Sequence, residues 1–182
     1  MKKILLLILF LTCACSNITE EVTTSQAEKN YEIKEISENN VIKYEYIIYG
    51  NDSNEMDKGI AFRISPNITK INETLQLCIS EGTGLRNCKY YDVEANKKSE
   101  WFESPLLSNG TLVISFDTLT KPTGIVVQDI FNKNKFYKWY EINFSDEEVW
   151  PLIDIKFVNN NEIEITYVSD NNNKVETKIV KL

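Results

Sequence analysis

Apolar and polar side chains alternate along one segment after another of this chain, and this alternation constrains the fold more than any other feature. In Val41–Tyr49, apolar and aromatic residues occupy every second position from Ile42 to Ile48. A period of two in β-branched and aromatic residues is typical of a strand that is buried on one face. The same kind of run predicts strands at 59–65, 74–80, 88–93, 111–116, 124–131 and 136–144.

The C-terminal region shows the pattern most clearly. Apolar and polar residues alternate in 153–157 and in 163–167, and 175–180 is expected to return beside them as a further strand. Asparagine-rich stretches at 159–161 and 170–173 separate these runs, and asparagine tolerates the positive φ angles of tight turns. The sequence therefore predicts a three-stranded antiparallel meander at the end of the chain.

Helical periodicity is almost absent, and about ten strands follow one another at the spacing of an all-β domain. We predict an all-β fold, an antiparallel β-sandwich of about ten strands. A lipocalin-like up-and-down β-barrel is the alternative, because the late strands read as simple neighbours. One helical turn is expected at Ser145–Glu148, where the spacing of a capping box precedes Pro151.

The first residues have the order of a secretory signal. Lys2 and Lys3 precede the apolar run Ile4–Leu11, and small residues and cysteines follow. The run is shorter than the roughly 20 apolar residues that span a bilayer, although an N-terminal anchor is the competing interpretation.

This segment resembles the signal peptide of bacterial lipoproteins, which have a small residue directly before the cysteine that is modified. Ala14 precedes Cys15, so the resemblance implies that Cys15 carries the lipid. Cys13, which follows Thr12, is the alternative. The resemblance further implies a thioether-linked diacylglycerol, an acylated amine and a place in the bacterial cell envelope. It favours the outer membrane or the cell surface over the inner membrane.

These features divide the chain into three parts. Residues 1–14 are the expected signal peptide, 15–30 the lipidated cysteine and a polar flexible tether, and 31–182 a single all-β domain.

Cys78 and Cys88 lie on either side of a glycine-containing turn that includes Gly82 and Gly84. Folding this segment as a hairpin places the two cysteines opposite each other. Exported domains fold under oxidising conditions, so we predict a Cys78–Cys88 disulfide. Two reduced, buried thiols are the alternative.

The chain contains no histidine and has a net charge of −7. The lack of histidine excludes Ser-His-Asp and Cys-His catalysis, and the acidic balance disfavours nucleic acids and anionic lipid head groups. We identify no catalytic constellation, no cofactor site and no metal site. The acidic triplet Asp146–Glu148 is interpreted as charge at a helix N-terminus, and Gly50–Gly59 as a hairpin loop in preference to a calcium site.

Trp101 and Phe102 lie in a polar segment that reads as a loop, and they are the candidate contacts for a protein or glycan partner. The competing interpretation is that they close the end of the core. The sequence thus predicts a non-enzymatic, lipid-anchored binding or interaction protein of the envelope. The alternatives are an acidic inhibitor of a basic enzyme such as a lysozyme, and a carboxylate-dependent glycan hydrolase.

Overall fold

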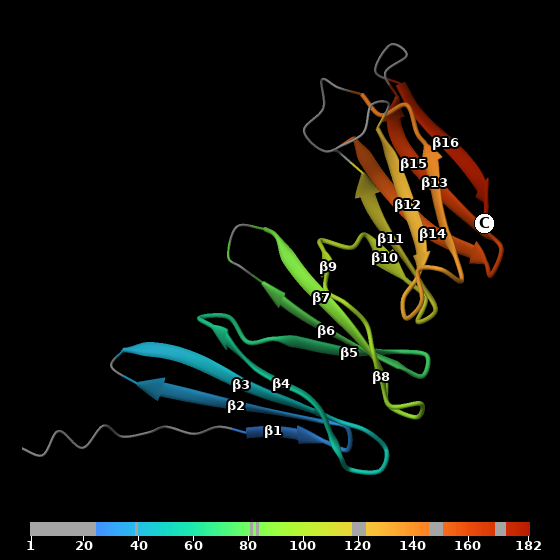
Figure 1. Cartoon of the computed structure of the whole chain (residues 1–182). Coiled ribbons are helices and arrows are strands. Elements are labelled where there is room, and N and C mark those ends of the chain that lie inside the picture. The colour runs from blue at the N-terminus through green and yellow to red at the C-terminus, as the bar shows by residue number, and fades with distance from the viewer. Residues whose placement is uncertain are drawn as a thin grey trace, which may run out of the picture.

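The computed structural model describes residues 25–38, 40–80, 82, 84–117, 123–145, 151–169 and 174–182. These residues form sixteen strands in four antiparallel sheets (Figure 1). Each sheet is built from strands that are consecutive in the chain, as expected where short turns join neighbouring strands. The predicted all-β class is confirmed.

The bounds of the strands are as follows. The first sheet contains β1 (Ser25–Glu28), β2 (Tyr31–Glu38), β3 (Val41–Tyr49) and β4 (Glu55–Phe62). The second contains β5 (Asn67–Ile71), β6 (Thr74–Ser80), β7 (Arg86–Asp92), β8 (Lys97–Lys98) and β9 (Phe102–Glu103). The third contains β10 (Leu107–Ser108), β11 (Leu112–Asp117), β12 (Gly124–Asp129) and β13 (Tyr137–Glu141). The fourth contains β14 (Leu152–Asn159), β15 (Glu162–Ser169) and β16 (Lys174–Lys181).

The sheets pack face to face, and successive pairs of sheets enclose three hydrophobic clusters. The first and second sheets bury Tyr31, Ile33, Tyr46, Ile48, Leu75, Leu77, Tyr91 and Val93. The second and third sheets bury the smaller cluster Cys88, Tyr90, Val113 and Ile130. The third and fourth sheets bury Ile114, Ile125, Val127, Ile142, Phe144, Ile163, Ile165, Tyr167 and Val180.

The two inner sheets are covered on both faces. Tyr90 and Tyr91 are adjacent on β7 and both fully buried, one in each neighbouring cluster. Val113 and Ile114 have the same relation on β11. The arrangement is therefore consistent with the predicted β-sandwich, with sandwich-type packing repeated from one sheet to the next. The lipocalin-like barrel is wrong, because none of these sheets closes on itself within the described ranges.

Two predicted strands match the structure to the residue, namely β3 and β6, and the C-terminal meander is confirmed as β14–β15–β16. The segment around Trp101 is not one loop as predicted, because it contains β8 and β9, which both pair with β7. Strands of two residues have no periodicity that a sequence could reveal.

Strand pairing begins before residue 31. In β1, Ser25 pairs with Lys34 and Glu28 with Tyr31, inside the stretch expected to be a tether. Residues 1–24, with the signal segment and both lipidation candidates Cys15 and Cys13, lie outside the described residues. The same is true of 146–150, with the acidic triplet, and of the turn at 170–173.

Candidate functional site

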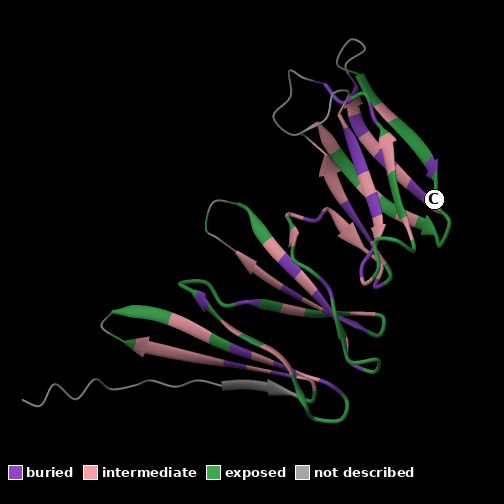
Figure 2. Cartoon of the chain, in the orientation of Figure 1, coloured by how far each residue is buried: buried purple, intermediate pink, exposed green. Residues whose placement is uncertain are grey.

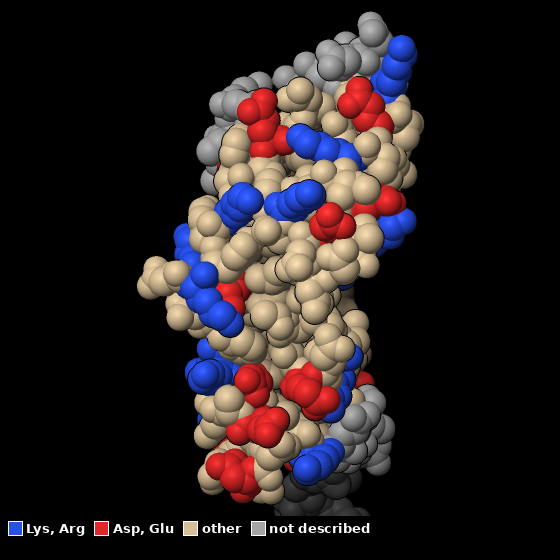
Figure 3. Space-filling model, turned by 90° about the vertical axis from the view of Figure 1, so that its right-hand side faces the viewer, with Lys and Arg blue, Asp and Glu red and all other residues tan. Residues whose placement is uncertain are grey.

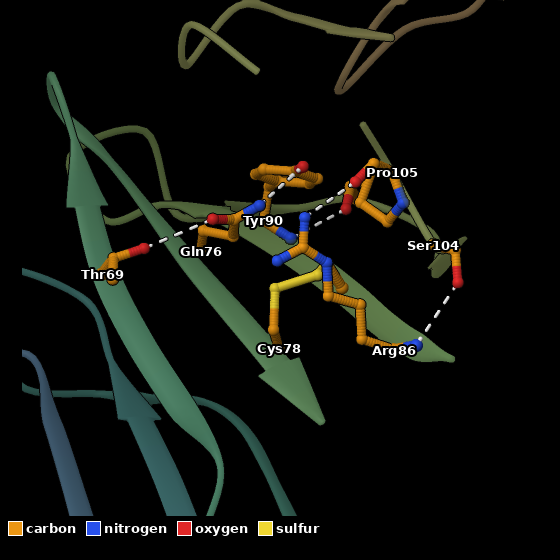
Figure 4. Close-up of a disulfide and its surroundings, with 9 residues drawn as sticks. Thr69, Gln76, Cys78, Arg86, Tyr90, Ser104 and Pro105 are labelled. Atoms are coloured by element: carbon orange, nitrogen blue, oxygen red, sulfur yellow. Dashed lines mark hydrogen bonds between the residues drawn. A yellow bond between two sulfur atoms is a disulfide. The ribbon is translucent and has the colours of Figure 1, made fainter. Parts of the chain in front are cut away.

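The disulfide predicted between Cys78 and Cys88 is confirmed (Figure 4). The two cysteines are directly paired across β6 and β7, and their Cα atoms are 4.1 Å apart. Cys88 is fully buried and packs in the cluster between the second and third sheets. The bridge therefore fixes a hairpin that contributes to the packing of two sheets.

Hydrogen bonds surround the bridge on both sides (Figure 4). The Gln76 amide donates to the Tyr90 hydroxyl at 2.9 Å, and Thr69 bonds the other end of the same amide at 3.3 Å. On the opposite side, the Arg86 guanidinium donates to the Pro105 carbonyl at 3.0 Å. The chain that follows β9 is thereby tied to the disulfide hairpin.

The two aromatic residues predicted as partner contacts point to opposite faces of the second sheet. Phe102 packs edge-on against Tyr90, with ring centroids 5.5 Å apart, and belongs to the cluster beneath the third sheet. Trp101 remains 42% exposed, and the Lys89 ammonium lies 5.5 Å from the centre of its ring. Of this pair, Trp101 offers the larger accessible surface.

Lys89 belongs to a polar network between the first and second sheets. Its ammonium lies 2.6 Å from the Asp57 carboxylate, which also accepts a 2.9 Å hydrogen bond from the Tyr91 hydroxyl. Burial alone would raise the pKa of Asp57, but the hydrogen bonds from Lys89 and Tyr91 and the nearby lysine charges together hold that pKa below its usual value. Burial and the adjacent Asp57 charge raise the pKa of Tyr91, which keeps its hydroxyl a donor.

A polar cleft of about 730 Å³ opens between the second and third sheets. It is lined by Asn72, Glu73, Thr74, Asp92, Lys97, Asn109, Gly110, Thr111, Asp129, Phe131, Asn132 and Lys135. The turns that supply these residues lie on the right-hand side of Figure 1, which Figure 3 turns toward the viewer. Acidic and basic side chains are interspersed on that face (Figure 3).

Hydrogen bonds between turns hold the walls of the cleft. The Asn72 amide donates to the Asn109 carbonyl at 2.7 Å, and the Thr74 hydroxyl donates to the Gly110 carbonyl at 2.9 Å. Gly110 has φ of +87°, and a Cβ there would lie 2.7 Å from the Ile71 carbonyl oxygen. Glycine is required at this joint by both its conformation and the lack of space.

The other wall is organised by Asp129, which is buried. Its carboxylate accepts 2.9 Å hydrogen bonds from the amides of Phe131 and Asn132 and lies 3.4 Å from the Lys135 ammonium. These contacts fix the loop between β12 and β13. Because the walls are already ordered by internal hydrogen bonds, binding of a ligand costs little free energy for ordering the site.

The cleft brings together charged residues that the sequence did not single out. Glu73 lies in the turn between β5 and β6, Asp92 and Lys97 are paired across β7 and β8, and Lys135 lies in the loop between β12 and β13. No spacing rule connects these three places, and turn propensity alone would have predicted the turns without showing that they meet. Carboxylates beside ammonium groups can bind a polar ligand that bears both charges.

The acidic side chains of the segment Gly50–Gly59, weighed above as a calcium site, make structural contacts instead. The Gly50–Gly59 segment is a hairpin turn only as far as Asn54, because β4 begins at Glu55. In the turn, Asp52 accepts hydrogen bonds from Asn54, while Asp57 lies on β4 and belongs to the network with Lys89. Across the described part of the chain, no group of three or more cysteine and carboxylate side chains gathers that could hold a metal ion. Within the same residues, no helix has the length and apolar character to cross a membrane.

Comparison of the chain with protein-family models, with curated proteins and with solved structures finds no significant match.

Proposed function

We propose that this protein is a non-enzymatic binding protein of the bacterial cell envelope, held there by a lipid on Cys15, and that it binds a polar ligand in the cleft between its second and third sheets. The observation that carries the proposal is this cleft, whose walls are fixed by hydrogen bonds between turns. Its volume of about 730 Å³ is in the range of small-molecule and peptide sites.

The lining supports a ligand that carries both charges. Lys97 and Lys135 present ammonium groups, and Glu73 and Asp92 present carboxylates, around an aromatic side chain, Phe131. A peptide segment of an envelope partner is the simplest chemical class with this combination. Mixed charges favour the correct partner over wrong ones more than they add to affinity.

The lipid anchor is tested by metabolic labelling with palmitate in a bacterial host. We expect label in the wild-type chain and in the Cys13→Ala variant, and none in Cys15→Ala. Label that persists in Cys15→Ala and disappears in Cys13→Ala would move the anchor to Cys13. An unlabelled wild-type chain would remove the anchoring part of the proposal.

The binding cleft is tested by placing a photo-crosslinking amino acid at Lys97 and, as the matched control, at the exposed Lys174 of β16. In intact cells, we expect an adduct at position 97 and none at 174. Adding Glu73→Gln should lower the yield at position 97 about fivefold, because one charged hydrogen bond to the ligand is lost. Equal adducts at both positions would show that the cleft is not the binding site.

A glycan hydrolase remains the second candidate because Glu73, Asp92 and Asp129 line the same cleft. Such an enzyme needs two carboxyl groups that face each other across the substrate. Release of soluble sugars from purified cell-wall glycan by the wild type, and its loss in Asp92→Asn, would favour this reading over binding alone.

A further inference from the structure

The free end of the first two sheets carries a concentration of exposed apolar side chains, which we call the apolar tip. It consists of Val41, Ile42, Ile60, Phe62, Ile64 and Leu85, which are between 40 and 58% exposed. The start of β3, the end of β4 and the β6–β7 hairpin meet at this end, on the left of Figure 1. Figure 2 shows exposed residues at the free end of β3 and at the start of β7.

A groove of about 560 Å³ runs through the tip. Its lining combines Val41, Ile60, Phe62 and Ile64 with Ile79 of the second sheet. Soluble proteins rarely leave a contiguous set of large apolar side chains in water unless that surface meets a partner or a membrane.

Backbone hydrogen bonds fix the turn at Arg63, which directly follows β4. Arg63 has φ of +67°, which is uncommon for a long side chain and is kept only where the surroundings impose it. The Arg63 amide donates to the Ile42 carbonyl at 3.0 Å, and the Ile64 amide donates to the Phe62 carbonyl at 2.8 Å. Phe62 and Ile64 are therefore presented by a hydrogen-bonded turn.

The chain that bears the proposed anchor enters at the same end. Ser25 pairs with Lys34, and β1 runs antiparallel to β2, so Ser25 is the end of β1 that is nearer to Glu38 and the tip. The four steps along the strand from Lys34 to Glu38 correspond to about 13 Å. Ser25 follows Cys15 by ten positions in the chain, a length that can extend up to ~35 Å. A lipid on Cys15 can thus enter a bilayer that the tip touches.

From this geometry we propose that the apolar tip docks on the bilayer that holds the lipid anchor, with Phe62 and Ile64 inserted at the boundary between head groups and acyl chains. This inference rests on the lipid anchor of the proposed function. Arg63 lies among the apolar side chains of the groove, and a long cationic side chain reaches phosphate groups from such a position. The polar cleft would then be held in a defined direction relative to the membrane.

The chemistry of the tip favours a bilayer over a second copy of the chain. A symmetric dimer across this groove would bring the two Arg63 side chains toward each other, and burying like charges without partners is costly. A bilayer surface instead offers phosphate oxygens beside hydrocarbon.

The test uses the full chain, purified from a bacterial host and reconstituted in vesicles of phosphatidylethanolamine and phosphatidylglycerol. The vesicles include a phospholipid with a photoactivatable group in its acyl chain, and adducts are mapped by mass spectrometry. We expect adducts in the peptides that cover 41–42, 60–64 and 85. Adducts confined to other peptides, or tip-to-tip crosslinks between two chains, would overturn the proposal.

The double variant Phe62→Asp/Ile64→Asp should lower the yield of tip adducts roughly tenfold or more, because two apolar side chains no longer enter the bilayer. The matched control is Val175→Asp/Ile179→Asp, which changes two apolar residues of β16 that are at least as exposed as Phe62 and Ile64 and should leave the yield unchanged. Equal yields in the two variants would contradict docking by the tip.

Palmitate incorporation is measured in the same preparation. The absence of a lipid anchor can therefore be distinguished from the absence of docking by the apolar tip. If the chain carries no lipid, the unlipidated chain is added to the same vesicles at high lipid concentration. Adducts at the tip would then still support docking, and their absence would overturn it.

Discussion

At the scale of single residues, Asp57 shows how burial and charge oppose each other in this protein. Its side chain is 16% exposed and accepts hydrogen bonds from Lys89 and Tyr91, which come from the neighbouring sheet. Removing one partner from a buried charged group costs more than the pair contributes when intact, because the other group stays in a poorly solvated place. The contact between the first two sheets therefore depends on all three groups of the network being present, because loss of one leaves the others without a partner.

We predict that Asp57→Asn lowers the free energy of unfolding by about 2 kcal/mol near neutral pH. The unfolded carboxyl titrates near 3.8, and the folded one at a lower pKa. The charged form hence stabilises the fold above that range, and this contribution is lost as the pH falls through the folded pKa.

Urea denaturation at neutral pH and below about pH 3 measures this effect. The deficit of Asp57→Asn should be largest near neutral pH and should shrink in acid. Glu55→Gln is the matched control on the same strand, since Glu55 pairs with Lys58 at the surface and should matter little. A deficit that is constant with pH would show that the charge of Asp57 does not contribute.

At the scale of elements, the β6–β7 hairpin is held by a covalent cross-link as well as by strand pairing. The Cys78–Cys88 bridge closes a short loop, with a sequence separation of 10 residues. In the chain-entropy model, a loop of this length stabilises the fold by about 2.5 kcal/mol. The hairpin carries Tyr90 and Tyr91, which are buried in two different clusters, so loosening it weakens both.

We predict that Cys78→Ala/Cys88→Ala lowers the free energy of unfolding by about 3 kcal/mol, from the lost cross-link and the loss of buried sulfur at Cys88. Thermal unfolding with and without reductant provides the measurement. Reductant should lower the melting temperature of the wild type and leave that of the variant unchanged. A reductant effect of equal size on both chains would argue that the bridge is not the source of the stabilisation.

At the scale of the whole molecule, stability depends on the stacking of the sheets. The third sheet has Ile114, Ile125 and Val127 on the face that the fourth sheet covers. Apolar side chains of this size contribute roughly 1.5–3 kcal/mol each when fully buried. An inner sheet that loses its neighbour exposes a whole apolar face to water.

We predict that a chain truncated before residue 152, which lacks the fourth sheet, does not fold to a stable monomer. Size-exclusion chromatography and limited proteolysis should show aggregation and rapid digestion. Deletion of residues 1–28 is the control, since β1, at the edge of the first sheet, is the one described strand that it removes, and it should leave a folded monomer. A truncated chain that stays monomeric and protease-resistant would show that the first three sheets form an independent unit.

The sequence alone determined most of the longer strands, the C-terminal meander and the Cys78–Cys88 disulfide. The alternation in Val41–Tyr49 and Thr74–Ser80 follows from side chains that point to opposite faces at successive positions, and the glycine turn places Cys78 opposite Cys88 through local chain geometry. Tertiary structure alone decided that the second and third sheets are covered on both faces, that Phe102 packs inward while Trp101 stays exposed, and that Glu73, Asp92, Lys97 and Lys135 share one cleft. Those relations join residues far apart in the chain, and contact between sheets depends on packing energy that no local pattern encodes.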